Sequence, residues 1–280
     1  MKGKIIFISG STDGIGKQAA LELAKQGAYI IIHGRNEDKT MKTVDFIKSE
    51  SKNKNVDFVL ADMSSFQQIR SMSEALHERY EKIDVLVNNA GAQIHEFQNS
   101  EDGYELSFAV NHLAYFLTTS LLLDLVAKSE YKRIVIVSSG MHFRVEKLDF
   151  DVLDGKTEYN LYNNYAHSKV ANIMFSYKLS RLLKDTGVTV NCLHPGLVNT
   201  NLNPRRPQHI VDRAIPVEEG NISTMRLVTD PELKRVTGKY FTSDGTEVES
   251  SPATYNLDDQ EKLWSLCEEY IGEKFPKFPS

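Results

Sequence analysis

Residues 5–16, Ile-Ile-Phe-Ile-Ser-Gly-Ser-Thr-Asp-Gly-Ile-Gly, decide the fold class. The apolar, β-branched run at 5–9 predicts a short strand buried on both faces. Glycines 10, 14 and 16 follow, and apolar residues then recur at helical spacing over 18–26. A strand, a glycine-rich turn and a helix predict a nucleotide-binding turn, because glycine lets the backbone approach a pyrophosphate and the helix N-terminus offers unpaired N–H groups. The Gly-x-x-x-Gly-x-Gly spacing differs from the commoner Gly-x-Gly-x-x-Gly, so a plain strand-to-helix turn is the alternative interpretation.

The same alternation continues along the chain. Further strands are expected at 28–33, 56–61, 83–87, 133–137, 188–193 and, briefly, 238–242. Further helices are expected at 39–50, from Ser64 or Ser65 to 80, at 105–128, from 165 onward, at 217–228 and at 257–271. This order predicts an α/β fold, a Rossmann-type doubly wound parallel sheet of about seven strands with helices on both faces. No linker or internal repeat divides the sequence, which predicts a single domain over 1–280.

Composition narrows the function classes. The 280 residues carry a net charge of -5 without a dominant basic block, which argues against a nucleic-acid surface. Cys192 and Cys267 are far apart without metal-ligand spacing, so we expect a reduced, cytoplasmic protein with no metal site. The apolar run at the N-terminus is too short for a signal peptide or a membrane span. Polar residues interrupt the run 114–126, and no membrane span is expected.

Arg35 follows the second predicted strand in the sequence His33-Gly34-Arg35-Asn36. An acidic residue about 20 positions beyond the glycine turn would bind the ribose 2′-hydroxyl of NAD(H). The arginine at this place suits a 2′-phosphate instead, so the sequence favours NADPH over NADH. A solvated arginine neutralised by Glu37 or Asp38 is the alternative.

Tyr165 and Lys169 stand four residues apart at the start of an apolar-periodic helix, and so share one face. A nearby ammonium favours the phenolate, and we expect it to lower the tyrosine pKa from its usual value of about 10. A tyrosine tuned in this way is a general acid or base for an alcohol or carbonyl. A chance pair on a solvated helix face is the alternative.

Other candidates lie at the carboxyl ends of predicted strands, where ligands bind in such sheets. Asp62 could bind an adenine amino group or cap a helix, and Asn88-Asn89-Ala90-Gly91 could shape the crevice. Ser139 could hold a substrate carbonyl oxygen while Tyr165 donates its proton. Asn111, inside a long helix, could kink it and hold a water chain, or hydrogen-bond its own backbone.

The region after the sixth strand contains a Pro195-Gly196 turn, which could bring backbone against a planar ring. Thr200 could reach a phosphate. The proline-containing, basic segment 201–216 is expected to form a mobile lid over the substrate. The long connection 141–164 has little periodicity and indicates a functional loop.

Taken together, the sequence resembles the short-chain dehydrogenase/reductase family over nearly its whole length. The matching motifs are Gly10-x-x-x-Gly14-Ile15-Gly16, Asn88-Asn89-Ala90-Gly91, Asn111, Ser139, Tyr165-x-x-x-Lys169 and Pro195-Gly196. Ser138-Ser139-x-x-His142 and His194-Pro195-Gly196-x-Val198-x-Thr200 resemble the retinol-dehydrogenase-like branch. Ser9 replaces the usual threonine of the family but retains a hydroxyl.

The resemblance implies that Tyr165 is the catalytic acid/base and that Lys169 binds the nicotinamide ribose and depresses the tyrosine pKa. It implies that Ser139 orients the substrate, that Asn111 supports a proton relay and that the Val198 backbone contacts the carboxamide. The cofactor contacts implied are Gly10, Ser11, Asp13, Gly14, Ile15, Gly16, Arg35, Asp62, Met63, Asn89, Ala90, Gly91, Tyr165, Lys169, Pro195, Gly196, Val198 and Thr200.

The function expected is an NADP(H)-dependent oxidoreductase acting on a small-molecule carbonyl or alcohol. The branch often carries a membrane-anchoring N-terminal segment. We expect none here, and the lid is basic; both expectations argue against retinoids as substrates. The long helices could pair in a homodimer. A catalytically silent nucleotide-sensing or scaffold protein of the same fold is the alternative. A hydrolase using Ser139 and His142 is disfavoured, because no Gly-x-Ser-x-Gly elbow surrounds the serine.

Overall fold

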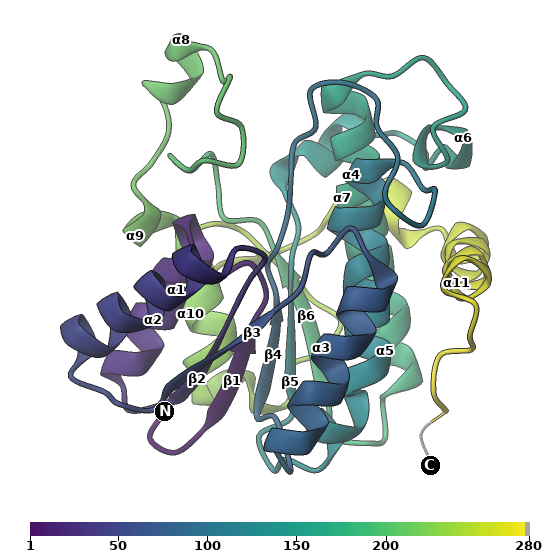
Figure 1. The fold of residues 1–280 in the computed structure, drawn as a ribbon. Coiled ribbons are helices and arrows are strands. Elements are labelled where there is room, and N and C mark those ends of the chain that lie inside the picture. The colour runs from purple at the N-terminus through teal and green to yellow at the C-terminus, as the bar shows by residue number, and fades with distance from the viewer. Residues whose placement is uncertain (278–280) are drawn as a thin grey trace.

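The computed structural model describes residues 1–277 and contains an eight-stranded sheet with helices on both faces (Figure 1). The strands are β1 (Ile5–Ile8), β2 (Tyr29–Gly34), β3 (Val56–Leu60), β4 (Val85–Asn88), β5 (Arg133–Val137), β6 (Thr189–Leu193), β7 (Tyr240–Phe241) and β8 (Glu247–Val248). Their order is β3-β2-β1-β4-β5-β6-β7-β8, parallel throughout except for the β7–β8 pair. The predicted doubly wound Rossmann-type fold is therefore confirmed. The strand number differs from about seven because β8, a two-residue strand, is too short to show a period.

Successive side chains of the strands enter two different cores, as a sheet covered on both faces requires. Phe7 packs into the core formed with α3 (Phe66–Arg79), α5 (Ala114–Ala127) and α7 (Leu161–Leu182). Its neighbours Ile6 and Ile8 pack into the other core, with α1 (Gly14–Lys25), α2 (Glu37–Ser51) and α10 (Ile222–Thr229). The alternation explains why these strands read as continuous apolar runs.

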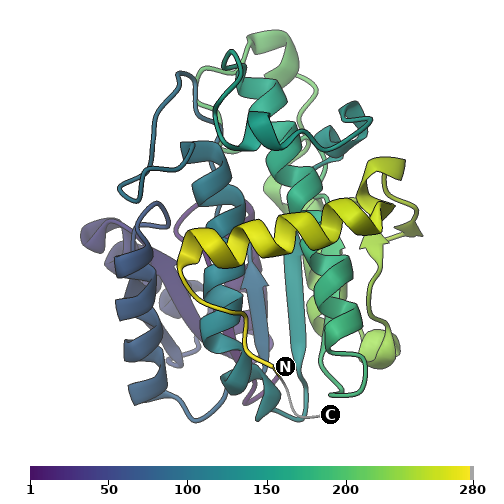
Figure 2. The same ribbon diagram turned by 90° about the vertical axis from the view of Figure 1, so that its right-hand side faces the viewer.

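The last helix, α11 (Leu257–Ile271), lies across α5 and α7 on the outside of the first core (Figure 2). Trp264 of α11 contacts Phe116 of α5 at 4.9 Å and Phe175 of α7 at 5.8 Å between ring centroids. These aromatic contacts cover the middle of α7, whose N-terminal part holds Tyr165 and Lys169.

The helix expected at 105–128 is divided into α4 (Leu106–Phe108), a π-helical turn (Ala109–Leu113) and α5. Asn111 lies in the π-helical turn. Its side chain accepts a hydrogen bond from Ala92 N at 2.8 Å and donates to Ala92 O at 3.0 Å and to Ser168 Oγ at 3.2 Å. The expected distortion is present, and Asn111 bonds a remote loop and α7 rather than its own helix.

The segment Leu106–Ala127 is long and apolar enough to cross a membrane, with a mean hydropathy of 1.4. The polar residues in the run 114–126 therefore do not exclude a span by length and composition, because the hydroxyls of Thr118, Thr119 and Ser120 do not lower the average hydropathy sufficiently. In this structure 83% of the 18-residue window is buried against the rest of the protein. Length and composition do not separate a membrane span from a core helix.

Several local predictions differ from the structure. The helix expected at 217–228 is broken at the buried Asn221 into α9 (Val217–Gly220) and α10. Ser65 is the N-cap of α3, but Asp102 rather than a serine hydroxyl accepts the hydrogen bond of Phe66 N, at 2.9 Å. The remaining elements are α6 (Phe150–Leu153), α8 (Gln208–Val211) and 3-10 turns at Gly140–Arg144, Pro231–Arg235 and Pro252–Tyr255.

A buried carboxylate, Asp84, joins three segments at the amino ends of the central strands β1 and β4. It accepts hydrogen bonds from Ile5 N at 2.8 Å and from Ser129 Oγ at 2.6 Å, and is fully buried. Lys4 and Lys82 approach it at 3.5 and 3.7 Å. The two charged amines offset part of the cost of burying this charge.

We expect Asp84→Ala to lower the free energy of unfolding by about 3 kcal/mol, because two buried donors lose their acceptor. Urea denaturation measures the change. The exposed Asp185→Ala is the control and should change stability by less than about 0.5 kcal/mol. Equal effects of the two substitutions would show that the Asp84 contacts do not stabilise the fold.

Candidate active site

The turn after β1 and the turn after β4 are held together by Ser9 and Asn89. Ser9 Oγ accepts hydrogen bonds from Asn89 N at 2.9 Å and from Ala90 N at 3.0 Å. Asn89 Nδ2 donates to Ser9 O at 2.9 Å and to Gly10 O at 3.1 Å. Gly10 has a φ of +64°, and a Cβ there would lie 2.7 Å from Ala90 Cα. Glycine is required at this position by both conformation and space.

The glycine turn then enters α1 beside a cleft of about 400 Å³. Asp13 caps α1 by accepting the hydrogen bond of Gly14 N at 2.8 Å. The cleft is lined by Thr12, Asp13, Lys17, Asn36, Asp38, Lys39, Lys42 and Thr43. The three lysines are not among the residues predicted from the sequence, although two have a recognisable signal: Lys17 directly follows Gly16, and Lys39 lies in the first turn of the helix after Arg35.

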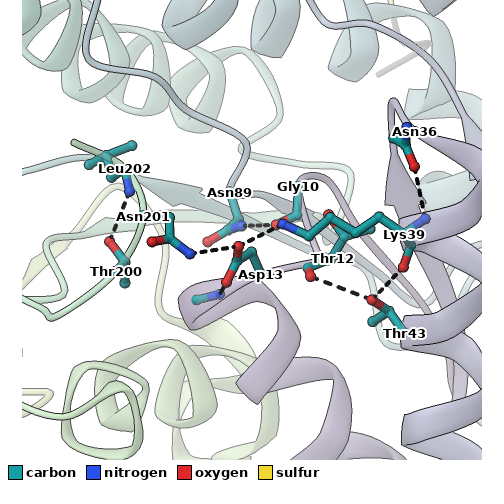
Figure 3. A network of polar contacts seen from close by, with 11 residues as sticks. Gly10, Thr12, Asp13, Asn36, Lys39, Thr43, Asn89, Thr200, Asn201 and Leu202 are labelled. Carbon is teal, nitrogen blue, oxygen red and sulfur yellow. Dashed lines mark hydrogen bonds and ion pairs between the residues drawn. The ribbon is translucent and has the colours of Figure 1, made fainter. Parts of the chain in front are cut away.

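Asp13 also connects the cleft to the segment 201–216, as Figure 3 shows. Its Oδ2 lies 2.6 Å from Lys39 Nζ and accepts a hydrogen bond from Asn201 Nδ2 at 3.1 Å. Burial alone would raise the pKa of Asp13, but hydrogen bonds from Lys39, Asn201 and Gly14 N hold it below its ordinary value. The carboxylate is therefore charged, and it joins α2, through Lys39, to the segment 201–216, through Asn201.

Arg35 and Asp62, both predicted cofactor residues, face each other at the outer end of β2 and β3. Arg35 is 78% exposed, and its Nη1 lies 3.7 Å from Asp62 Oδ2. Asp62 Oδ1 accepts hydrogen bonds from Ser64 N at 2.9 Å and Ser64 Oγ at 2.8 Å. The acidic neighbour of Arg35 is thus Asp62, not Glu37 or Asp38, and Asp62 forms a local turn ahead of α3.

Tyr165 and Lys169 point to the same side of α7 and are 5% and 3% exposed. Lys169 Nζ lies 5.4 Å from the ring centroid of Tyr165 and donates to Val137 O at 3.3 Å. Burial lowers the pKa of Lys169 to about 7. Burial also raises the pKa of Tyr165 to about 12, although polar interactions with Ser139 and Gln93 and the charge of Arg206 oppose the rise.

The direction of the Tyr165 pKa shift is opposite to the sequence prediction. A four-residue spacing predicts the approach of the amine, which is present, but it does not reveal that both groups are withdrawn from water. Desolvation disfavours the phenolate and the ammonium alike, and in this structure it is the largest effect on each.

The end of β5 is fastened to α7 at the same place. Ser138 Oγ donates to Lys169 O at 2.8 Å, and Ser139 begins the 3-10 turn by accepting the hydrogen bond of Met141 N at 3.2 Å. Ser139 lies close enough to the Tyr165 hydroxyl to oppose the rise of its pKa.

Asn111 and Gly91 complete this cluster from the other side. A Cβ on Gly91 would lie 3.3 Å from Asn111 Oδ1 and 3.7 Å from Lys169 Nζ. Ser168, which accepts from Asn111, donates its own hydroxyl to Tyr165 O at 2.7 Å. The structure thus brings Asn111, Ser139, Tyr165 and Lys169 together at the carboxyl ends of β4 and β5.

The turn after β6 closes the crevice. His194 Nδ1 accepts the hydrogen bond of Gly196 N at 3.1 Å, and Gly196 has a φ of +90°. A Cβ on Gly14 would lie 3.0 Å from the Thr200 methyl group, so the glycine turn and Thr200 are in contact. Arg206 Nη1 donates to Val198 O at 2.9 Å.

The other predicted cofactor residues divide into two groups. Gly16, where a Cβ would lie 2.5 Å from Asn89 Nδ2, and the half-buried Ile15 and Pro195 border the crevice. Ser11 and Met63 are buried in the fold. The Ser11 hydroxyl is used by Ile8 O and His33 N, so only its backbone could contact a ligand.

The described residues offer little for hydrolytic or metal chemistry. His142 Nδ1 lies 2.7 Å from the backbone oxygen of Ser139, so the ring is bound away from the hydroxyl that it would have to activate. Burial lowers the pKa of His142 to about 4. Within 1–277, no three His, Cys, Asp or Glu side chains are grouped to hold a metal ion.

Comparison with known proteins agrees with this geometry. A sequence profile of the family described as short chain dehydrogenase matches residues 4–210. Human retinol dehydrogenase 13 is 36% identical, over 98% of this chain and 86% of that protein. Mouse retinol dehydrogenase 14 is 34% identical, over 97% of this chain and 87% of that protein. A short chain dehydrogenase from Escherichia coli CFT073, solved in complex with NADPH, superposes with a TM-score of 0.68 at 23% identity, covering 87% of this chain and 97% of the other.

The match to the family profile spans most of the chain, and the two retinol dehydrogenases align with it almost from end to end. The fold is that of the solved relative. Family membership brings with it an oxidoreductase activity and a nicotinamide cofactor. The chain therefore belongs to the short-chain dehydrogenase/reductase family and to its retinol-dehydrogenase-like branch.

Proposed function

We propose that this protein is an NADP(H)-dependent oxidoreductase that interconverts a carbonyl group and an alcohol, with Tyr165 as the acid/base. The observation that carries the proposal is the burial of Tyr165 and Lys169 on one face of α7, with Ser139 and Asn111 around them. When bound, the nicotinamide cofactor supplies the hydride donor or acceptor. The remaining chemistry, the proton transfer and the orientation of the substrate, falls to these side chains.

The residues along the crevice fit a dinucleotide. Gly10 and Gly14 have φ of +64° and +50°, and a Cβ on either would crowd Ala90 or Thr200, so only glycine allows the tight turn that a pyrophosphate-binding loop needs. The N-terminus of α1 adds unpaired N–H groups and a positive dipole end. Lys169 lies at the other end of the crevice, where it would hold the nicotinamide ribose.

A 2′-phosphate fits the cationic side chains around the cleft beside α2. Lys17, Lys39 and Lys42 line that cleft, and Arg35 lies in the turn just before α2. Lys39 would exchange its exposed contact with Asp13 for the phosphate, which is the stronger anion. The Escherichia coli relative solved with NADPH supports the preference by analogy.

Reduction of a carbonyl requires a protonated acid, and burial keeps Tyr165 protonated at neutral pH. Ser139 would hold the carbonyl oxygen so that the Tyr165 proton is transferred to it. Lys169, with a pKa near 7, would return a proton to Tyr165, and Asn111 would support that relay through its bonds to Ala92 and Ser168. Oxidation of an alcohol would use the same groups in reverse.

The segment 201–216 would act as the substrate lid. It is anchored at the glycine turn by Asn201 and at the loop after β4 by Asn203, whose Oδ1 lies 2.8 Å from His95 Nε2. Figure 1 shows α8 above the carboxyl ends of the strands, on the side of α1 and α9. A lid attached at these points would enclose substrate after the cofactor has bound.

Tyr165→Phe tests the acid/base assignment. We expect kcat to fall about 100- to 10,000-fold, because the proton donor is removed while the ring still packs. NADPH binding, followed by cofactor fluorescence, should change less than about threefold, since the hydroxyl contributes one hydrogen bond at most. Tyr162→Phe, on an exposed ring of the same helix, is the control and should retain turnover. Normal turnover in Tyr165→Phe would rule out the acid/base role of Tyr165. If the wild type binds NADPH but turns over no ketone, aldehyde or alcohol, a nucleotide-sensing protein is favoured instead.

Charge removal at the cleft tests the NADP(H) preference. The double variant Arg35→Gln, Lys39→Gln should raise the dissociation constant for NADPH about 10- to 100-fold and leave that for NADH nearly unchanged. Calorimetric titration measures both constants. Lys25→Gln, at the opposite end of α1, is the matched control. Equal weakening of both cofactors would contradict a 2′-phosphate role.

Lys169→Met tests whether the buried amine is kept for activity at the expense of stability. The unfolded chain holds the lysine proton up to a pKa of about 10.4, whereas the folded state releases it near pH 7. Folding therefore releases a proton between these values, and wild-type stability should rise with pH over this window by an amount on the order of 3 kcal/mol. The variant should lack this rise and be the more stable protein at pH 7, while turnover falls at least about 100-fold.

Urea denaturation at pH 7 and pH 10 gives the comparison, and the difference between the two proteins isolates Lys169 from other titrating groups. Lys178→Met is the control, because this lysine of the same helix forms an ion pair with Glu261. Parallel pH dependence of Lys169→Met and wild type would contradict the desolvation argument.

A further inference from the structure

Arg206 lies in the proposed lid and is held in a defined place. Its backbone N–H donates to Asn203 O at 3.2 Å, and Asn203 in turn contacts His95 at 2.8 Å. Its guanidinium donates to Val198 O at 2.9 Å, and Val198 is paired with Ile215 at the other end of the segment. The side chain is thus directed to the turn after β6, inside the boundary of the crevice.

The guanidinium has donors to spare. Its hydrogen bond to Val198 O uses one of five N–H groups. Of the ion pairs formed within 1–277, none involves Arg206 or Lys169. Arg206 is half-buried, whereas its neighbours Arg205 and Arg213 are exposed to solvent. A half-buried cation without a carboxylate partner is a suitable site for an anion.

The position of Arg206 relative to Tyr165 indicates that the anion it binds is part of the substrate. The charge of Arg206 is felt at the Tyr165 hydroxyl, where it opposes the effect of burial on the pKa. Arg206 is bound to the turn after β6 through Val198 O and, through Asn203 and His95, to the loop after β4, so a group bound to it would lie over the strand ends beside which Tyr165 stands.

We infer that Arg206 binds a carboxylate of the substrate, so that this enzyme prefers carbonyl or alcohol compounds that also carry an acidic group. The inference rests on the proposed function, because it takes Tyr165 as the reacting end of the pocket. A guanidinium pairs with a carboxylate through two parallel hydrogen bonds, which would fix the substrate in orientation as well as position. A neutral substrate would remove the guanidinium from water without giving it a carboxylate partner. A site of this kind therefore discriminates strongly against neutral substrates.

Two pairs of substrates test the inference with NADPH: benzoylformate against its methyl ester, and 4-formylbenzoate against its methyl ester. The pairs place the carboxylate beside the carbonyl or across the ring from it. In the wild type, kcat/KM should favour the acid in at least one pair by about tenfold or more, the range expected for a charged hydrogen-bonded contact. Arg206→Gln should remove that preference, mainly through KM, and leave turnover of the methyl ester within about threefold.

Arg205→Gln is the matched control, since it removes the same charge from the adjacent, exposed position. It should keep the preference for the acid. The inference is overturned if the wild type shows no preference in either pair, or if Arg206→Gln slows acid and ester equally. Equal slowing would mean that Arg206 acts on the cofactor or on Tyr165.

A binding measurement separates this inference from the proposed function. Benzoate is titrated calorimetrically into the NADP-saturated protein, and Arg206→Gln should weaken its binding about tenfold or more. If benzoate binding depends on Arg206 but no carbonyl compound is turned over, the anion site is supported and the proposed function is contradicted. If carbonyl compounds are turned over but the wild type and Arg206→Gln bind benzoate equally, the proposed function is supported and the anion site is overturned.

Discussion

The close approach of two backbone turns, after β1 and after β4, is the constraint on which the site depends. Four hydrogen bonds cross it, two between Ser9 and Asn89, one from Asn89 to Gly10 and one from Ala90 to Ser9, and Gly10 leaves no room for a side chain against Ala90. β1 lies between β2 and β4. Successive strands are added on one side of β1 up to β3 and on its other side from β4 onward, so this is the point at which the strand order reverses. The groups of the active site stand on these two turns, on the strand ends beside them, or on helices that border the crevice.

The four candidate catalytic side chains are placed there at a cost. Tyr165 and Lys169 are almost completely withdrawn from water, which disfavours the charged form of each. The surrounding structure limits their movement rather than neutralising them: Val137 accepts from the amine, and Ser138 holds the α7 backbone at Lys169. A buried amine without a carboxylate partner contributes little to folding.

One segment, 201–216, reaches both ends of the crevice. Asn201 contacts Asp13 and, through it, Lys39 at the lysine-lined cleft, whereas Arg206 donates to Val198 O at the turn after β6. These contacts are only a few residues apart in the sequence. An arrangement of this kind allows the occupancy of the cofactor end to affect the substrate end through a short, directly bonded path.

The sequence alone determined the strands other than β8, the presence of most helices and the candidates at the strand ends, because these depend on local periodicity and on glycines in tight turns. The strand 133–137 and the helix 257–271 have the predicted bounds, and Tyr165 and Lys169 share a face as their spacing requires. The tertiary structure alone decided the two-residue β8, the π-helical turn at Asn111, the lysine cleft and the position of Arg206. It also decided the direction of the Tyr165 pKa shift. These features depend on which distant segments exclude water from a group or contact it, and no local pattern carries that information.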